Sequence, residues 1–316
     1  MSIRFFALFL ALLLLSSLLP AQQLRSVGPA APDPLTPALI AWARVPIVEK
    51  QVTEVSLLLS VTDQKGHFVE GLKPQDFSIF DNSKQQSSIT FFQSQTNLPL
   101  DVALVLDASG SMATRFDAEK WTINLFLREV IRQEDMVELF AFNNKIRAML
   151  PVHYNWRKVS RQVKKMKPRG ETALYDAVTA AAQWLQQDQR PARRIVILLS
   201  DGEENASNAT LDATLGTLLK AGAAVYSVND GDDLDSNVGQ QGEATLKLLA
   251  LSTGGTYRRA SFDGDVGTAF GRIRKELRSQ YAIAYRPSDR SVPGFHYLEV
   301  LAGKLYVHCR SGYYAR

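Results

Sequence analysis

The side chains best suited to chemistry lie in a pentapeptide that follows a strongly apolar run. Asp107, Ser109 and Ser111 stand at alternate positions after LDVALVL, with Gly110 between the two serines. Carboxylate and hydroxyl oxygens are ligands for hard cations such as Mg²⁺, Mn²⁺ and Ca²⁺. Residues at positions i, i+2 and i+4 of a tight loop can converge on one ion. The spacing therefore predicts a metal site at the end of a buried strand.

The alternative for this pentapeptide is structural, because Ser and Asp at a strand-to-helix turn often cap the next helix. Asp117 is expected to be a helix cap or a surface charge. Asp176 is expected to be a carboxylate at a helix N-terminus or one that contacts a metal ligand rather than the ion. Glu203 and Glu204 either influence partner choice or are simply exposed. The acidic loop at residues 230–235 lacks the D-x-D-x-D-G order of an EF-hand, so we do not expect a calcium site there.

Between residues 100 and 277 the chain alternates apolar strands with amphipathic helices. The expected strands are LDVALVLD, MVELFAFN, IRAMLPV, RIVILLSD and AAVYSVND, and the expected helices cover residues 118–132, 156–166, 173–187, 211–221, 244–252 and 266–278. Continuous apolar strands are typical of a sheet covered by helices on both faces. The fold class is therefore α/β, a doubly wound and mostly parallel sheet. The short interval at residues 143–145 predicts a hairpin and one antiparallel edge strand.

Two further segments are expected to reach the same edge of this sheet. Asp107 and Asp201 each end an apolar strand, and ligands bind at the carboxyl ends of strands in open α/β sheets. Thr172 lies in a glycine-containing loop, GET, that opens a helix, so its hydroxyl can face the same rim. If the two strands are neighbours, five oxygen-bearing side chains surround one ion.

This arrangement resembles the von Willebrand factor type A family. The metal-ion-dependent adhesion site of that family reads D-x-S-x-S, then a Thr in a later loop, then an Asp in a further loop. Asp107, Ser109, Ser111, Thr172 and Asp201 match in order, with GETALYDA and SDG as supporting motifs. The resemblance implies that both serines are direct ligands, that Thr172 binds directly or through water, and that the two aspartates often bind through water.

Strand patterns without helices lie on both sides of the α/β segment. VTEVSLLLSV, HFVEGL, DFSIFDN and SITFF precede it, and YAIAYRP, FHYLEVLAG and KLYVHCRSGYYAR follow it. We expect one smaller all-β domain built from residues 47–97 and 280–316, with the von Willebrand factor type A domain at residues 98–279 inserted. The flanks also resemble exported bacterial members of the family, especially an acidobacterial subgroup, with Asn82 where a glycine is expected in a left-handed turn.

The N-terminus has the order of a secretory signal peptide. Arg4 precedes an apolar run that ends near Pro20-Ala21, too short to span a membrane, so we expect cleavage after residues 1–21. Residues 22–46 are rich in proline and alanine and are expected to be a linker. The alternative is an uncleaved anchor. The predicted location is exported, in the periplasm, at the cell surface or outside the cell.

Composition and charge narrow the classes of partner. The 316 residues include one cysteine, Cys309, so no internal disulfide forms. A formal net charge of +4 does not indicate nucleic-acid binding. The run Lys164, Lys165, Lys167, Arg169 could meet anionic surfaces, but such a run at a helix end is expected to be a solvated face that also suits the helix dipole.

Neutral hydroxyl ligands favour binding over catalysis. Because hydroxyls are neutral, the ion keeps positive charge that can attract an acidic group. We therefore expect a secreted, non-enzymatic module that captures an Asp or Glu of a protein partner through a divalent cation. Mg²⁺ is the expected ion, with Mn²⁺ or Ca²⁺ as alternatives. The competing hypotheses are a structural envelope component with a fold-stabilising ion and a metal-dependent hydrolase using Glu171 or Glu203 as base.

Overall fold

The computed structural model describes residues 54–315, apart from short segments at 95–97, 149–151, 154, 188–189, 191, 232–235, 261–265 and 290–292. The expected signal peptide and linker lie outside these residues. Within the described part of the chain, none of the helices combines the length and the apolar character that a bilayer crossing requires.

A seven-stranded sheet forms the centre of the α/β part. Its order is β11-β10-β9-β5-β6-β7, and β8 also pairs with β6. The strands are β5 (Leu100–Asp107), β6 (Met136–Phe142), β7 (Ile146–Ala148), β8 (Val152–His153), β9 (Arg193–Ser200), β10 (Ala224–Asn229) and β11 (Tyr257–Arg259). β5, β6, β9, β10 and β11 are parallel, whereas β7 and β8 are both antiparallel to β6. The mostly parallel sheet is confirmed, and its expected antiparallel edge consists of two short strands.

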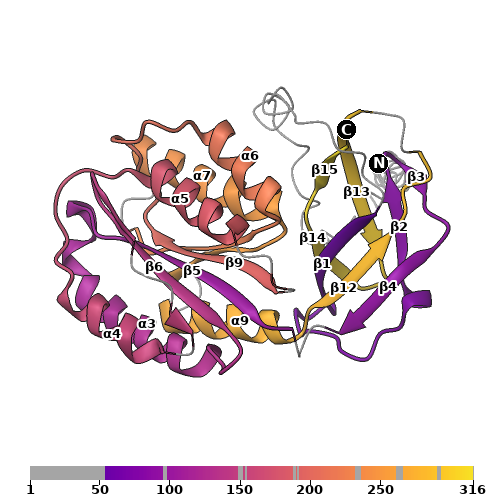
Figure 1. Ribbon diagram of the computed structural model, residues 1–316, viewed down its shortest axis with the longest axis horizontal. Coiled ribbons are helices and arrows are strands. Elements are labelled where there is room, and N and C mark those ends of the chain that lie inside the picture. Colours follow the sequence, from indigo (N-terminus) through magenta and orange to yellow (C-terminus); the bar gives the residue numbers. More distant parts are fainter. Residues whose placement is uncertain are drawn as a thin grey trace, which may run out of the picture. The chain divides into compact units, whose positions relative to one another are not determined.

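Helices cover both faces of this sheet, with α3, α4 and α9 on one side and α5, α6 and α7 on the other (Figure 1). Their bounds are α3 (Phe116–Val130), α4 (Trp156–Lys165), α5 (Leu174–Gln187), α6 (Leu211–Ala221), α7 (Asn237–Thr253) and α9 (Val266–Arg278). Every residue of β5 and β6 is buried, as two covered faces require. The apolar sequence of these strands thus follows from their place between two helical layers.

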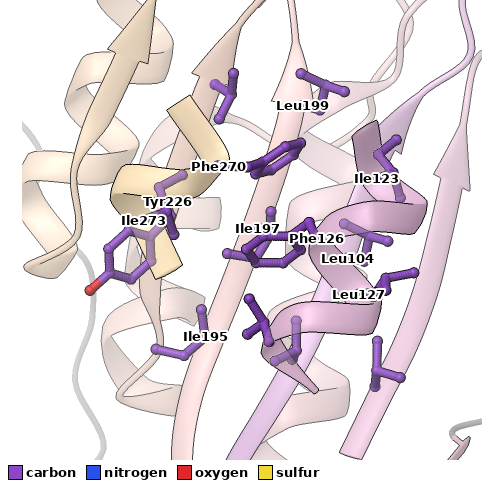
Figure 2. Packing of buried hydrophobic residues seen from close by; sticks show 14 of the residues in the cluster. Leu104, Ile123, Phe126, Leu127, Ile195, Ile197, Leu199, Tyr226, Phe270 and Ile273 are labelled. Atoms are coloured by element: carbon purple, nitrogen blue, oxygen red, sulfur yellow. The ribbon is translucent and has the colours of Figure 1, made fainter. Parts of the chain in front are cut away.

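The core on the α3 and α9 side shows how the strands are fixed in place. Phe126 of α3 and Phe270 of α9 stack with ring centroids 4.8 Å apart. Figure 2 shows these rings with Leu104 and Ile197, which come from the adjacent strands β5 and β9. The two central strands are therefore held in register beneath tightly packed helices, and their carboxyl ends have a fixed relation to each other.

Strands from the two flanks of the chain pair with each other. One sheet has the order β14-β1-β12-β4 and the other β15-β13-β2-β3. The strands are β1 (Val55–Thr62), β2 (Ser78–Asp81), β3 (Lys84–Gln85), β4 (Ile89–Ser94), β12 (Tyr281–Tyr285), β13 (Gly294–Leu301), β14 (Tyr306–Cys309) and β15 (Gly312–Ala315). Both sheets contribute to one apolar core, and we call the pair the flanking sandwich. That it is a separate domain with the expected bounds stays a prediction.

Three local features differ from the sequence expectations or refine them. HFVEGL is not a strand but makes a single bridge between Thr62 and Phe68, because the chain reverses at residues 63–66 and then leaves the sheet. Asn82 has φ of 47°, the left-handed turn conformation expected for it. Helix α7 begins seven residues before the expected start at Ala244, since glycines 239 and 242 lower helix propensity but not enough to prevent the helix.

Candidate metal site

The pentapeptide lies at the end of β5, where the chain turns into the short 3₁₀ helix η4 (Gly110–Thr114). The Ser109 backbone N–H donates to Asp107 Oδ1 at 2.9 Å, which closes the turn. The Oγ atoms of Ser109 and Ser111 are 3.1 Å apart. Asp107 and Ser109 are buried and Ser111 is exposed. The two hydroxyls therefore converge at a place that opens to solvent on one side.

The loop that carries Thr172 is joined to this turn by backbone hydrogen bonds. Gly110 N–H donates to the carbonyl of Gly170 at 3.0 Å, and Arg169 N–H donates to the carbonyl of Ala108 at 2.8 Å. Gly170 has φ of +84°, a conformation that favours glycine. The Thr172 side chain is buried beside these contacts. The structure thus brings the third predicted segment to the rim.

The Asp201 loop completes the rim from the neighbouring strand. β9 pairs in parallel with β5, so Asp201 follows the strand next to the one that ends at Asp107. Asn205 holds Thr172 from both sides, accepting from its N–H at 2.8 Å and donating its own N–H to the Thr172 carbonyl at 3.0 Å. Asp201 Oδ1 accepts from Glu203 N–H at 3.0 Å. Three segments distant in the sequence are therefore linked at one edge of the sheet.

Two positions important to this geometry were not singled out from the sequence. Ser200 Oγ donates to Asp107 Oδ2 at 2.6 Å and accepts from Gly202 N–H at 3.0 Å. This hydrogen bond from Ser200 orients the Asp107 carboxylate. Asn205 fixes the Thr172 backbone, as described above. The SDG motif contains Ser200 and could have indicated it, but nothing local to Asn205 identifies a residue that contacts another loop.

The site has excess negative charge in a buried setting. The pKa of Asp107 is raised to about 7, mainly by burial and also by the neighbouring charge of Asp201, although hydrogen bonds from Ser200 and Ser109 oppose the shift. Burial and the nearby charge of Asp201 therefore disfavour ionisation of the Asp107 carboxyl group. A cation beside Asp107 would offset that cost, so the electrostatics suit a divalent ion.

A second acidic pair lies behind the rim. The pKa of Glu119 is raised to about 9, first by burial and then by the Asp230 carboxyl beside it, whereas Arg115 opposes the shift. Arg115 Nε is 3.6 Å from Asp230 Oδ2. Burial therefore favours the protonated form of Glu119 on α3. No local pattern indicates this position, because Glu119 has the spacing of an ordinary surface residue of a helix.

The donor set fits a hard cation bound mainly by hydroxyls. The predicted residues supply three hydroxyls and two carboxylates, all oxygen ligands. Among the residues that the structure describes, no group of three or more His, Cys, Asp or Glu side chains is placed to hold a metal.

Residues 102–204 match the family model described as the von Willebrand factor type A domain. All five predicted site residues fall inside this match, and the doubly wound sheet described above contains it. The chain carries a von Willebrand factor type A domain. Membership of an acidobacterial subgroup stays a prediction.

Similar proteins were found among curated sequences and solved structures. Inter-alpha-trypsin inhibitor heavy chain H3 of Pongo abelii is 25% identical over 182 residues, covering 53% of this chain and 20% of that protein. An uncharacterized protein of Synechocystis sp. is 24% identical over 162 residues, covering 50% of this chain and 37% of its own. The present chain thus spans about a fifth to about a third of the length of these relatives.

Two solved structures show similarity at low sequence identity. A von Willebrand factor type A protein of Catenulispora acidiphila superposes with a TM-score of 0.49 at 14% identity, covering 76% of this chain and 73% of that chain. Proximal thread matrix protein 1 of the mussel byssus, whose metal-ion-dependent adhesion site holds zinc, gives a TM-score of 0.49 at 18% identity, covering 62% of this chain and 50% of its own.

Proposed function

We propose that this protein is an exported module that binds another protein through a divalent cation. The ion is held by Asp107, Ser109, Ser111, Thr172 and Asp201, with Mg²⁺ expected and Mn²⁺ or Ca²⁺ as alternatives. The observation that carries the proposal is the set of backbone hydrogen bonds joining three loops at one sheet edge. Those bonds support the proposal because they join the segments that carry the hydroxyl and carboxylate residues.

An acidic side chain of the partner completes the coordination. Three of the five proposed ligands are neutral, so the two aspartates at most balance a double positive charge. A carboxylate held through water screens the ion less than one bound directly. An additional Asp or Glu oxygen is therefore attracted to the open side at Ser111, and partial exclusion of water strengthens that attraction.

We propose binding rather than catalysis for this ion. His67 and His308 belong to the flanking segments, and His296 is buried against Asp81 in the flanking sandwich. Glu203 donates its backbone N–H to Asp201, and its side chain is half-buried at the rim. A hydrolase hypothesis would have to use Glu203 or the exposed Glu171 as its base.

Calorimetric titration of the mature protein with Mg²⁺, Mn²⁺ and Ca²⁺ tests the metal site. Asp107→Asn keeps an acceptor for the Ser109 N–H but removes the charge, so we expect at least about a tenfold loss of affinity. Ser109→Ala should have a similar effect. Asp117→Asn, at an exposed carboxylate on α3, is the matched control and should bind normally. Equal affinity in all variants would overturn the proposed ligands.

Capture of a partner tests the binding function separately. The wild-type protein, incubated with envelope extract, should retain a partner in Mg²⁺ and release it in chelator, while circular dichroism shows the fold intact. Loss of the fold in chelator would instead support the structural role of the ion. Capture that is indifferent to chelator would contradict a metal-mediated contact.

A further inference from the structure

A long segment next to the candidate metal site contains cations but no acidic residue. Between Glu138 and Glu171 the sequence has nine Lys or Arg residues and no Asp or Glu. Seven of the nine lie within residues 157–169, on α4 and the loop after it. They are Arg157, Lys158, Arg161, Lys164, Lys165, Lys167 and Arg169, and we call them the α4 cation face.

The α4 cation face is exposed and has no counter-charge within the described structure. All seven side chains are exposed, and none of them forms an ion pair with a described residue. The opposite side of α4 is buried through Val159 and Val163. Like charges at helical spacing repel one another, and this repulsion slightly lowers the stability of the unbound protein. An anionic partner would relieve that repulsion.

The α4 cation face leads to the rim of the candidate metal site. β8 pairs with the beginning of β6, at Val137, so α4 starts near the amino ends of the strands and runs back towards their carboxyl ends. Beyond α4, the Arg169 carbonyl accepts from Asn143 Nδ2 at 2.9 Å, and its N–H donates to Ala108 in the metal-site turn. The last cations therefore lie beside the loop that carries Ser109.

A membrane surface fits this face less well than a polypeptide does. Helices that lie in a bilayer interface insert large apolar side chains opposite their basic face. The apolar side of α4 instead packs on the protein, and Trp156 lies half-buried beneath the Arg157 guanidinium, 4.9 Å from the ring. No large exposed hydrophobic residue was found within the described part of residues 156–169. The α4 cation face therefore offers a partner only charge complementarity. The face leads to the candidate metal site, where the ion would bind a carboxylate.

We propose that the α4 cation face binds an acidic segment of the partner, adjacent to the Asp or Glu that the metal takes. This inference rests on the proposed function and specifies its partner as a polypeptide with clustered acidic residues. Ten helical residues extend about 15 Å. An extended peptide rises about 3.3 Å per residue. About five acidic residues would therefore run along α4, with one more at the ion.

Two synthetic peptides test this inference with the full mature protein. One has ten Glu residues, and the other has one Glu among nine Gln, so both can supply a metal ligand but only the first can engage the α4 cation face. In Mg²⁺ we expect the all-Glu peptide to bind at least about tenfold more tightly. The difference should shrink as salt is raised, because the added contacts are exposed charges.

Charge reversal identifies where the difference arises. In Lys164→Glu/Lys165→Glu/Lys167→Glu the two peptides should bind with nearly equal affinity. In the matched control Lys65→Glu/Lys84→Glu/Lys304→Glu, which changes the net charge equally at exposed sites of the flanking segments, the difference should persist. A difference retained in the α4 variant would overturn the inference. So would equal losses in both variants, which would reflect net charge alone.

Two further readouts separate this inference from its alternatives. If neither peptide responds to chelator or to Asp107→Asn while the α4 variant still removes the difference, the proposed metal-mediated function fails and the acidic partner stands. If the α4 variant loses binding to phosphatidylglycerol vesicles but keeps the peptide difference, the face binds lipid and the inference is wrong.

Discussion

At the scale of single residues, the Asp201 loop depends on a close approach between two glycines. Gly202 has φ of +84°, and a Cβ there would lie 2.3 Å from the carbonyl oxygen of Gly242 in α7. Gly242 in turn has no room for a Cβ, which would be 2.6 Å from the Asp201 carbonyl oxygen. The early turns of α7 are therefore pressed against the loop that presents Asp201.

Gly202→Ala should be far more destabilising than the matched substitution Gly222→Ala. Both glycines have a left-handed backbone conformation, so each substitution costs about 1 kcal/mol of backbone strain. Gly222 has open space around it, whereas Gly202 faces backbone that cannot move away without shifting α7. We expect Gly202→Ala to cost at least about 3 kcal/mol in all. Chemical denaturation measures both, and equal losses would show that the α7 contact is unimportant.

At the scale of elements, Glu276 links α9 to the strand β1 of the flanking sandwich. Ser60 Oγ donates to Glu276 Oε1 at 3.3 Å, and Thr256 Oγ1 donates to Oε2 at 3.1 Å. The side chain is almost fully buried, and burial raises its pKa to about 7. The positive charge of Arg258 opposes that shift without cancelling it. The last helix is thus joined to the flanking strands through a carboxyl group that titrates near neutrality.

Glu276 should make the protein less stable as pH rises from about 5 to about 8. With its pKa raised on folding, the folded state binds more protons than the unfolded state in this range, so the free energy of unfolding falls with increasing pH. The full effect is up to about 3 kcal/mol. In Glu276→Gln the decline should be smaller by this amount. Denaturant titrations at several pH values measure it, with exposed Glu299→Gln as the control that should leave the slope unchanged.

At the scale of the whole molecule, the flanking sandwich is organised around one buried carboxylate. Asp81 on β2 accepts from Tyr285 and Tyr313 at 2.7 Å each, and its other oxygen lies 2.7 Å from His296 Nδ1. The three partners lie on β12, β15 and β13. One side chain from the N-terminal flank therefore holds three strands of the C-terminal flank.

Asp81→Ala should loosen the flanking sandwich while leaving the α/β part folded. Three buried polar groups would lose their acceptor, at a cost of about 3 kcal/mol or more. Hydrogen exchange should accelerate at the amides of β12, β13 and β15, whereas β5 and β9 stay protected because their core does not include these strands. Loss of protection throughout would mean that the expected separate domains do not exist. Glu299→Ala, exposed on β13, should change neither region.

Much of the fold could be predicted because its signals are local and periodic. The continuous apolar runs that became β5, β6 and β9 are a direct consequence of burial on both faces. The D-x-S-x-S spacing at the end of β5 sets the convergence of Ser109 and Ser111, since the distance between their hydroxyls depends on only three residues of backbone. Composition and order alone were sufficient for these features.

Only the tertiary structure decided which distant groups meet. The contact of Ser200 with Asp107, the close approach of Gly242 to Gly202 and the burial of Glu119 all depend on contacts between segments tens of residues apart, which leave no periodic trace in the sequence. The environment of the α4 cation face was likewise decided by the tertiary structure. Its charges can be counted in the sequence, but whether acidic side chains from elsewhere neutralise them depends on packing. Local pattern specifies what each segment can bury, whereas long-range packing specifies what each buried or exposed group meets.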